Sequence, residues 1–545
     1  MSGDAFDYVI VGGGSAGLLL AERLSADSRN SVCVLEAGPP DHHPFIHLPA
    51  GFIKVLFNPR YTWSFKMEPT ANTAGRSLTA FQGKTLGGTS SINGMIYNRG
   101  LPSDFNSWAQ RGNRGWSFDE VLPYFKRTET KVGIGDDHFR GHSGKLHVTD
   151  NDWFHPICEA FIAAAKGVGV PETSDYNGKD HSGVSYAQRT IYRGRRMSSA
   201  RAFLRPAKSR KNLEIRTESR AISIVWDGKR ATGVRYLRGS GERGEQVFAK
   251  REVILSCGAL NTPRLLQLSG IGDASHLQSR GVQITHNLPG VGKSLKDHFM
   301  VRIVARAKNA LTLNELSRGP YLGLNAAKWL LGRPNILGVS PSLVMVHGKS
   351  NAALDASDVR GMFAPGSYKD GFIALLDDHP GMTCGFQQHR PESSGSIQIK
   401  SSDPFVDPII DLNYLASKVD QNALIGGLLL GRRIFQSAEL STYFHSESLP
   451  GAQVQTHDEW LDFARRYGNP ANHYVGSARM GPATDPTAVV DDQLRVHGLQ
   501  ALRVADSSIM PNITSANTCC STYMIAEKAA DMIMGLPPLS LEPAI

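Results

Sequence analysis

The feature that most constrains the fold lies at the N-terminus, where a short apolar run leads directly into a cluster of glycines. Residues 8–11 (YVIV) have the composition of a buried parallel strand, and the pattern G-x-G-x-x-G begins immediately afterwards, at Gly12. Residues 18–24 are helical in composition, and a second apolar run over residues 31–35 predicts another strand. This order predicts a strand–turn–helix–strand unit at the start of a parallel sheet.

Each glycine of the cluster, together with an acid that follows, fits the binding of a dinucleotide. Gly12 permits the tight turn, Gly14 lets a pyrophosphate approach the backbone, and Gly17 lets the helix pack close to the strand. The helix N-terminus favours the anion. Glu36, which ends the second strand, has the spacing of an acid that holds a ribose hydroxyl and repels the 2′-phosphate of NADP. This region alone does not distinguish FAD from NAD.

Composition and charge set the wider limits. The 545 residues are too many for one hydrophobic core, so the length predicts two or more domains. A composition of 41% apolar and 20% charged residues is typical of a globular protein. The net charge is +9, with the densest basic stretch over residues 189–216. Such a stretch could bind nucleic acid or attract an anionic substrate, but no nucleic-acid motif accompanies it. We interpret it as a solvated face and expect no nucleic-acid partner.

The six cysteines form neither a zinc pattern nor a disulfide framework, so we expect no metal site. The first strand begins too early to leave room for a signal peptide, and the longest apolar runs fall far short of the roughly 20 residues of a spanning helix. We therefore expect no transmembrane segment and a location in the reducing cytoplasm, either free or peripheral to a membrane.

Two longer segments distinguish between the dinucleotides. Residues 83–100 (GKTLGGTSSINGMIYNRG) and 258–272 (GALNTPRLLQLSGIG) resemble, along their whole length, the two signature segments of the glucose–methanol–choline (GMC) oxidoreductase family. The resemblance extends over residues 7–535 and is greatest to the bacterial choline dehydrogenase and aliphatic alcohol dehydrogenase branch. It implies an FAD cofactor.

The resemblance also implies which residues hold the flavin. Gly87 and Gly94 leave room for the backbone to approach it, and Thr89 and Asn93 offer hydrogen bonds. The predicted cofactor-binding residues are Gly12, Gly14, Ser15, Ala16, Gly17, Glu36, Ala37, Gly87, Thr89, Asn93, Gly94, Met95, Ala221, Gly258, Asp506, Ser507, Asn517 and Thr518. Some family members tether FAD to a histidine where this chain has Ile92, so we expect non-covalent FAD.

A third segment, residues 472–481 (NHYVGSARMG), resembles the family pattern H-P-x-G-T-x-R-M-G, whose histidine is the catalytic base. His473 takes that position, while Tyr474 replaces the proline and Ser477 the threonine. Oxidation of an alcohol needs such a base, because the hydroxyl proton must leave as a hydride passes from carbon to flavin N5. His473 is therefore the predicted base.

The closing segment, residues 503–518, resembles the family's flavin-contacting C-terminal region. It implies that Asp506 lies near the pyrophosphate and ribitol of FAD, and that Asn517 stands beside the base. An asparagine amide there can donate to the substrate oxygen and hold it against His473. The following residues, 522–534, are expected to form a helix that closes the nucleotide-binding domain.

The fold class implied is α/β (α+β overall), with a Rossmann-like FAD-binding domain of discontinuous chain and a substrate domain on a largely antiparallel sheet. We expect the main FAD-binding part over residues 1–307, with substrate-side insertions around 40–75 and 150–190. The substrate domain would cover residues 308–467, and residues 468–545 would return to the FAD-binding domain.

The middle of the chain is less informative. Residues 396–400 alternate like a strand, and residues 407–411 add a second extended piece. Residues 321–346 are rich in apolar side chains that could line an access channel or lid, or simply pack in a core. His389 precedes a segment that borders the substrate cavity in relatives, so it is a candidate for the substrate side.

The function that these features predict is FAD-dependent oxidation of a primary alcohol to an aldehyde or further. A light-driven flavin decarboxylase is one alternative, but that branch lacks the base that His473 provides. A non-catalytic flavoprotein is another. The identity of the small-molecule alcohol stays open, since no carboxylate or aromatic cage for a quaternary ammonium group can be placed from the sequence. The electron acceptor (oxygen, a quinone or another acceptor) and the oligomeric state also stay open.

Overall fold

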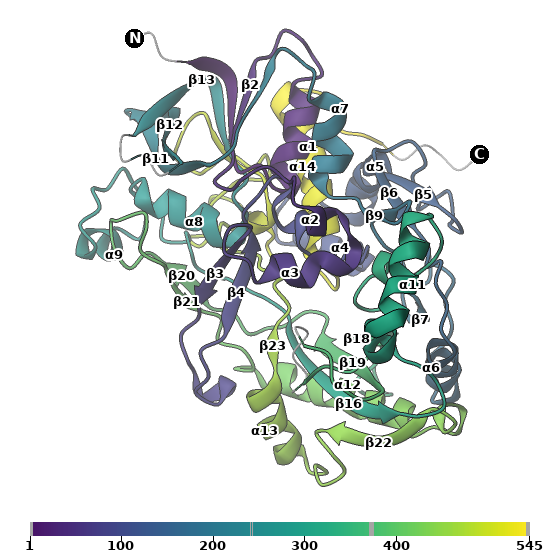
Figure 1. Cartoon of the computed structure of the whole chain (residues 1–545). Helices are drawn as coiled ribbons and strands as arrows, with labels where there is room; N and C mark the ends of the chain where they lie inside the picture. Colours follow the sequence, from purple (N-terminus) through teal and green to yellow (C-terminus); the bar gives the residue numbers. More distant parts are fainter. Residues whose placement is uncertain (1–3, 240, 242–243, 370–374, 541–545) are drawn as a thin grey trace.

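The computed structural model of the chain describes residues 4–239, 241, 244–369 and 375–540. Two seven-stranded sheets dominate it, one in the upper and one in the lower half of Figure 1. The upper sheet is mainly parallel, and the lower sheet is antiparallel throughout. This arrangement confirms the predicted fold class, in which a dinucleotide-binding sheet is joined to an antiparallel substrate-side sheet.

The upper sheet contains the strand that precedes the glycine cluster. In spatial order its strands are β10 (Leu213–Arg216), β2 (Val32–Leu35), β1 (Ala5–Val11), β13 (Glu245–Leu255), β12 (Arg230–Arg238) and β11 (Ser219–Asp227), with β24 (Leu502–Val504) beside β13. The parallel register pairs Val11 with Leu35, so β1 and β2 end at the same edge. The glycine cluster and Glu36 therefore emerge together, as a dinucleotide site requires.

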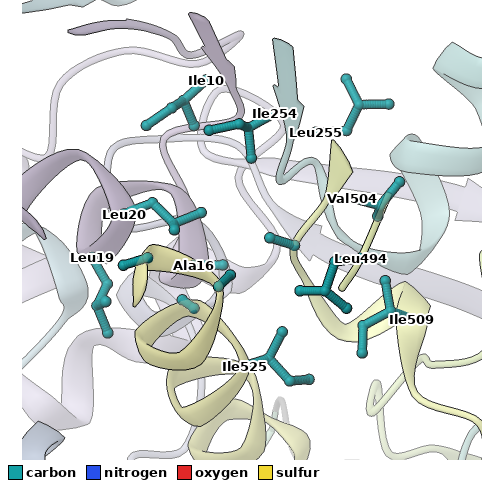
Figure 2. Close-up of a cluster of buried hydrophobic side chains, with 14 of the residues drawn as sticks. Ile10, Ala16, Leu19, Leu20, Ile254, Leu255, Leu494, Val504, Ile509 and Ile525 are labelled. Atoms are coloured by element: carbon teal, nitrogen blue, oxygen red, sulfur yellow. The ribbon is translucent and has the colours of Figure 1, made fainter. Parts of the chain in front are cut away.

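Two helices from opposite ends of the chain pack side by side against this sheet (Figure 1). α1 (Ser15–Leu24) follows the glycine cluster, and α14 (Thr518–Met534) returns from the C-terminal segment to lie along it. Figure 2 shows the core that these helices share with β1, β13 and β24, where Leu20, Ile254 and Ile525 are completely buried. The C-terminal helix begins one turn earlier than the sequence predicted.

The lower sheet is built mainly from the middle of the chain. In spatial order its strands are β22 (Phe444–Leu449), β16 (Phe299–Ala307), β19 (Gly381–Gln388), β18 (Val359–Ala364), β17 (Val344–Gly348) and β7 (Gly183–Tyr186), with β23 (Asn469–Pro470) beside β16. Helices α12 (Lys418–Phe435) and α6 (Pro156–Gly167) pack on one face through a large apolar cluster. The opposite face is turned toward the nucleotide-binding sheet.

The pairing of β16 bears on where the boundary between the two domains is drawn. β16 pairs with β19 and β22 of the lower sheet along its whole length, so residues 299–307 belong with the substrate side. β23, although it follows residue 467, also pairs with β16. We therefore propose a boundary near residue 298, with short exchanges of chain on both sides. The edge strand β7 comes from the expected insertion over residues 150–190.

Of the predictions for the middle of the chain, the two extended pieces are confirmed as strands, and the apolar stretch over residues 321–346 divides into a surface helix and a buried strand. β20 (Ser396–Gln398) and β21 (Ile409–Asp411) exist, but they pair with each other beside α8 (Gly258–Leu268) and do not join the lower sheet. Helix α11 (Gly319–Leu330) lies largely on the surface, with Leu330 78% exposed. That helix therefore forms neither core nor cavity wall, whereas the strand that follows it is buried.

The basic stretch over residues 189–216 is a solvated face only in part. Arg193, Arg195 and Lys208 are exposed as expected. Three other members, however, are buried and hydrogen-bonded within the protein: Arg189, Arg196 and Arg216. A count of charges along the sequence could not separate these two groups, because their difference lies in tertiary contacts.

The remaining elements are short connections around the two sheets. They are α2 (Pro44–His47), α3 (Phe52–Leu56), β3 (Thr62–Lys66), β4 (Thr79–Gly83), α4 (Pro102–Gln110), α5 (Phe118–Thr128), β5 (Glu129–Val132), β6 (Leu146–Thr149), β8 (Ile191–Tyr192), β9 (Arg195–Arg196), α7 (Arg205–Ala207), β14 (Ile271–Gly272), α9 (Ala274–Ser279), β15 (His286–Asn287), α10 (Leu313–Leu316) and α13 (His457–Tyr467). Within the described part of the chain, no helix has both the length and the apolar character needed to cross a bilayer.

Candidate active site

A cavity of about 720 Å³ lies where the carboxyl edge of the upper sheet faces the lower sheet. His473 and most of the predicted cofactor-binding residues line it. The latter are Gly12, Gly14, Ser15, Ala16, Glu36, Ala37, Thr89, Asn93, Gly94, Met95, Ala221, Gly258, Asp506, Ser507, Asn517 and Thr518. Gly17 and Gly87 do not line the cavity, and their contribution is to the backbone behind it.

The glycine cluster fits a bound pyrophosphate. A Cβ atom at Gly17 would lie 1.9 Å from the carbonyl oxygen of Gly12, so only glycine lets α1 pack this close to the turn. At Gly14, which lines the cavity, a Cβ would by contrast have its nearest neighbour at 3.8 Å, an ordinary van der Waals contact. No side chain caps the N-terminus of α1, and its first turn holds no acid, which leaves that end suited to an anion.

Glu36 is more deeply embedded than the sequence predicted. It is 5% exposed, and its two carboxylate oxygens accept hydrogen bonds from the backbone N–H groups of Gly13 (2.9 Å) and Gly38 (2.8 Å). Burial raises the pKa of Glu36 to about 7. Glu36 therefore lies within the protein interior at the edge of the cavity, and its carboxylate also holds the glycine turn in place.

The loop after β4 completes the flavin-side wall, and a buried arginine organises it. Arg196 donates from Nη1 to both the backbone oxygen (2.7 Å) and the side-chain oxygen (2.8 Å) of Asn93, and from Nε to the backbone oxygen of Ile46 (2.9 Å). Gly94 packs against Pro341, where a Cβ would come within 2.9 Å of the proline ring. Arg196 was not singled out from the sequence, since it stood among many basic residues.

The loop that carries His473 is held by polar contacts on both sides. The backbone N–H of His473 donates to Asp297 (2.5 Å). Asn472, in a left-handed conformation with φ 61°, accepts hydrogen bonds on its side-chain oxygen from the backbone of Phe81 (3.0 Å) and the hydroxyl of Tyr474 (2.8 Å). Tyr474 thus replaces the usual proline with a side chain that braces the strained residue before the base.

Three side chains form a hydrogen-bonded chain that ends in the cavity. His298 Nε2 lies 2.8 Å from the backbone oxygen of His389, and His298 Nδ1 lies 3.0 Å from His473 Nδ1. A carbonyl only accepts, so His298 carries its proton on Nε2, and its Nδ1 accepts from His473. His473 therefore has an unprotonated Nε2, which receives the amide of Asn517 at 2.9 Å.

The electrostatic setting keeps this pair of histidines neutral. Burial, together with neighbouring His298 and Arg360, lowers the pKa of His473 well below its usual value. Burial and Arg360 likewise lower the pKa of His298 to about 3. A neutral imidazole with an unprotonated Nε2 at the wall of a cavity is the form that a general base needs.

Two predicted site residues, Asp506 and His389, make hydrogen bonds that hold neighbouring parts of the protein in place. Asp506 accepts from the backbone of Gly258 (2.8 Å) and the hydroxyl of Thr262 (2.6 Å), so it fixes the turn at the start of α8. His389 does not line the cavity; it is 1% exposed and lies behind His298, to which it offers its backbone oxygen. A direct role for the His389 side chain on the substrate side stays a prediction.

Asp297 and His298 were missed by the sequence reasoning. They sit directly before β16 as Lys296-Asp297-His298, with no pattern of spacing to connect them to residue 473. The signal that could have found them is an adjacent acid and histidine directly before the apolar run over residues 299–305. Among the described residues, no cluster of histidine, cysteine or acids is arranged to hold a metal ion.

Comparisons with known proteins agree with this geometry. Models of GMC oxidoreductases match residues 6–300 and 391–526. The oxygen-dependent choline dehydrogenase of Sinorhizobium fredii is 41% identical over 539 residues, covering 98% of this chain and 96% of the relative. Pyridoxine 4-oxidase from Mesorbium loti has a TM-score of 0.87 at 31% identity, over 96% of this chain and 98% of that one. A formate oxidase has a TM-score of 0.90 at 26% identity, over 98% and 99% of the two chains. The chain therefore belongs to the GMC oxidoreductase family.

Proposed function

We propose that the protein oxidises a primary alcohol with FAD, and that His473 is the base. The observation that carries this proposal is the His473–Asn517 pair. Its two nitrogen atoms lie 2.9 Å apart in the wall of the same cavity that the dinucleotide motif lines. The family and its choline dehydrogenase relatives support an alcohol as the hydride donor.

The residues present divide the chemistry between them. FAD, when bound, supplies N5 as the acceptor of the hydride that leaves the alcohol carbon. The alcohol O–H donates to Nε2 of His473, which takes the proton while the carbon loses two electrons with the hydride. His298 accepts the Nδ1–H of His473 and so keeps Nε2 free for that proton. The product is an aldehyde, because the alcohol has lost a proton from oxygen and a hydride from carbon.

The side chain of Asn517 does not cap its own helix, which supports its proposed role beside the base. It is the N-cap residue of α14, a position where asparagine usually accepts a backbone hydrogen bond, yet its side chain makes no such cap. Its amide nitrogen instead faces His473, and its buried oxygen has no partner among the described residues. A substrate oxygen that bridges the pair would accept from Asn517 and donate to His473, which places the reacting group.

We further propose that FAD is bound without a covalent tether. Ile92, which takes the tether position, is 3% exposed, lines the cavity and packs in a small apolar cluster with Ile46, Val55 and Tyr61. An aliphatic side chain cannot form the bond. Acid precipitation should release yellow FAD into the supernatant, and flavin that stays in the pellet would contradict this proposal.

The function is tested by mixing the FAD-loaded protein with a primary alcohol in the dark and without oxygen. We expect the absorption of oxidised flavin to disappear. Bleaching that requires light, with release of CO₂ from a fatty acid, would support the decarboxylase alternative. A flavin that no alcohol bleaches would support a non-catalytic flavoprotein.

The acceptor and the compartment are also proposals. We propose that oxygen or a quinone reoxidises the flavin, which is tested by following reoxidation of the alcohol-reduced protein with each acceptor. All six cysteines are free, which supports a reducing compartment such as the cytoplasm, with the protein either free or peripheral to a membrane.

A further inference from the structure

At the substrate end of the cavity stands an arginine that has no counter-ion within the part of the chain that the structure describes. Arg302, on β16, lines the cavity and is partly exposed there. Among the described residues its guanidinium has no hydrogen-bond or ion-pair partner. Burial lowers the pKa of Arg302 from its usual value, while the neighbouring phenol of Tyr368 acts in the opposite direction. An arginine in a pocket carries a permanent charge with five donors in a planar fork, the geometry that matches a carboxylate.

The other arginines of the cavity differ from Arg302 in one respect. Arg76 donates to the backbone oxygens of Arg465 and Gly468, and Arg264 donates to the backbone oxygen of Val406 at 2.9 Å. Arg220 likewise donates to a backbone oxygen, that of Pro404. These three are satisfied by the protein, whereas Arg302 is left to pair with a ligand.

Two further donors stand beside Arg302 on the same wall. Thr383 is 4% exposed, and its hydroxyl has no partner among the described residues. Tyr368 is 7% exposed, and burial raises the pKa of its phenol, so it remains a donor at neutral pH. Gly385 pairs with Arg302 across the strands, and a Cβ there would lie 3.1 Å from the arginine side chain, so the glycine makes room for it.

Between this polar end and the base the wall is apolar. Side chains two apart on a strand share a face, so Met300 and Arg302 of β16 line the cavity one after the other. His298 directly precedes this strand and contacts the base from behind the cavity wall. At about 3.3 Å per residue, the Cα atoms of His298 and Arg302 are roughly 13 Å apart. Met362 and Ala364 of β18 line the same stretch.

Among the described residues, the cavity presents no free carboxylate to a cation. Its acidic lining residues are Glu36 and Asp506, and both are engaged by backbone N–H groups at the nucleotide end. The ring of Trp63 already has cations over it, Lys84 at 4.7 Å and Arg220 at 5.1 Å. A quaternary ammonium substrate would meet neither a free carboxylate nor a vacant tryptophan face, and it would face the charge of Arg302.

We propose that the substrate is an alcohol that carries a carboxylate, joined to its hydroxymethyl group by an apolar body, and that Arg302, Tyr368 and Thr383 bind this carboxylate. The inference rests on the proposed function and specifies its substrate class. It also separates this chain from an enzyme specialised for choline, because the pocket favours the opposite charge.

The test uses the FAD-loaded protein and matched primary alcohols that differ only at the far end: methyl, carboxylate or trimethylammonium, in a series of increasing chain length. The measurement is flavin reduction without oxygen. We expect the carboxylate compound to exceed its methyl counterpart by roughly 10- to 150-fold in the apparent second-order rate, the range of a lost charge-assisted hydrogen bond. The trimethylammonium compound should be the poorest, and the preference should peak at one chain length.

Three variants assign the preference to the arginine. In Arg302→Met the ratio of carboxylate to methyl rates should fall to near one, and Arg302→Lys should restore part of it. The matched control is Arg306→Met, at an exposed position on the same strand, which should keep the wild-type ratio. If Arg302 had a purely structural role, Arg302→Met would lower the rates with the methyl, carboxylate and trimethylammonium compounds together, and the ratio of carboxylate to methyl rates would stay as in the wild type.

The outcomes separate this inference from the proposed function. If alcohols reduce the flavin but the methyl or trimethylammonium compounds do as well as the carboxylate, the inference is wrong and the function stands. If no alcohol reduces the flavin, the function is wrong. Titration of the carboxylate compounds, followed by the flavin absorption of wild type and Arg302→Met, then decides whether the site binds them.

Discussion

At the nucleotide end of the cavity the wall is mostly backbone, whereas at the substrate end it is mostly side chain. Gly12, Gly14 and Gly17 lie within six residues of each other, and the absence of a Cβ atom at each of them permits the close approach of backbone or ligand. Arg302 and Thr383 come from strands far apart in the sequence and line the same cavity because β16 and β19 pair in one register. A backbone site is therefore encoded locally, while a side-chain site depends on the whole sheet.

The largest expected effect tests the backbone side of this comparison. Gly17→Ala places a Cβ 1.9 Å from the backbone oxygen of Gly12. Because α1 and the glycine turn cannot both keep their positions, we expect little folded, FAD-loaded protein. Gly14→Ala is the matched control, with its nearest neighbour at 3.8 Å and φ −87°. It should fold and lose FAD affinity, because the methyl group occupies the space for the pyrophosphate. Circular dichroism and bound-flavin absorption separate the two results, and equal behaviour of both variants would refute the packing argument.

A smaller effect is expected from His298, which acts on the base from the substrate-side sheet. His298→Phe removes the acceptor for the Nδ1–H of His473, so the tautomer is no longer fixed. Loss of a group that orients a functional histidine typically costs about 10- to 100-fold. His298→Gln can still accept from His473 and donate to the His389 oxygen, so it should recover part of the rate. The measurement is flavin reduction without oxygen, and no difference between the two variants would contradict the role of His298.

Glu36 is expected to have a weaker effect on the rate and a clear one on retention. Glu36→Ala leaves the N–H groups of Gly13 and Gly38 without their acceptor, which should lower stability by about 1–3 kcal/mol and weaken FAD binding. Protein that retains FAD should still reduce it at close to the wild-type rate. Equilibrium dialysis of FAD and denaturant unfolding provide the two measurements. Undiminished FAD affinity would assign this acid a purely structural role.

The smallest expected effect is that of pH. A histidine whose pKa in the folded protein lies below its usual value stays neutral as the pH falls through that value, so it remains a base. Burial lowers the pKa of His473 in this direction, and Arg360 adds to the shift. The rate of flavin reduction should therefore stay nearly flat as the pH falls from 8 through 6.5, and should decline only well below pH 6.5. A tenfold loss per pH unit that begins near pH 6.5 would show that His473 has an ordinary pKa.

The sequence was informative where chemistry follows from a short stretch of chain. It predicted β1, α1, β2 and the FAD-binding loops, and it singled out His473 and Asn517, which the structure brings together. It could not predict that Glu36 is buried, because the cover comes from loops distant in sequence. It also missed His298, Arg196 and Arg302, since an isolated polar residue gains its meaning only from strand register and tertiary packing.

The central claim is that His473 is the base of alcohol oxidation, and flavin reduction by alcohol without oxygen tests it most directly. His473→Ala should keep bound FAD and lose about 10²–10⁴-fold in this rate, the usual contribution of a general base. Asn517→Ala should lose less, roughly 10- to 150-fold, because it removes one hydrogen bond and leaves the base. A His473→Ala protein that reduces its flavin at the wild-type rate would contradict the assignment.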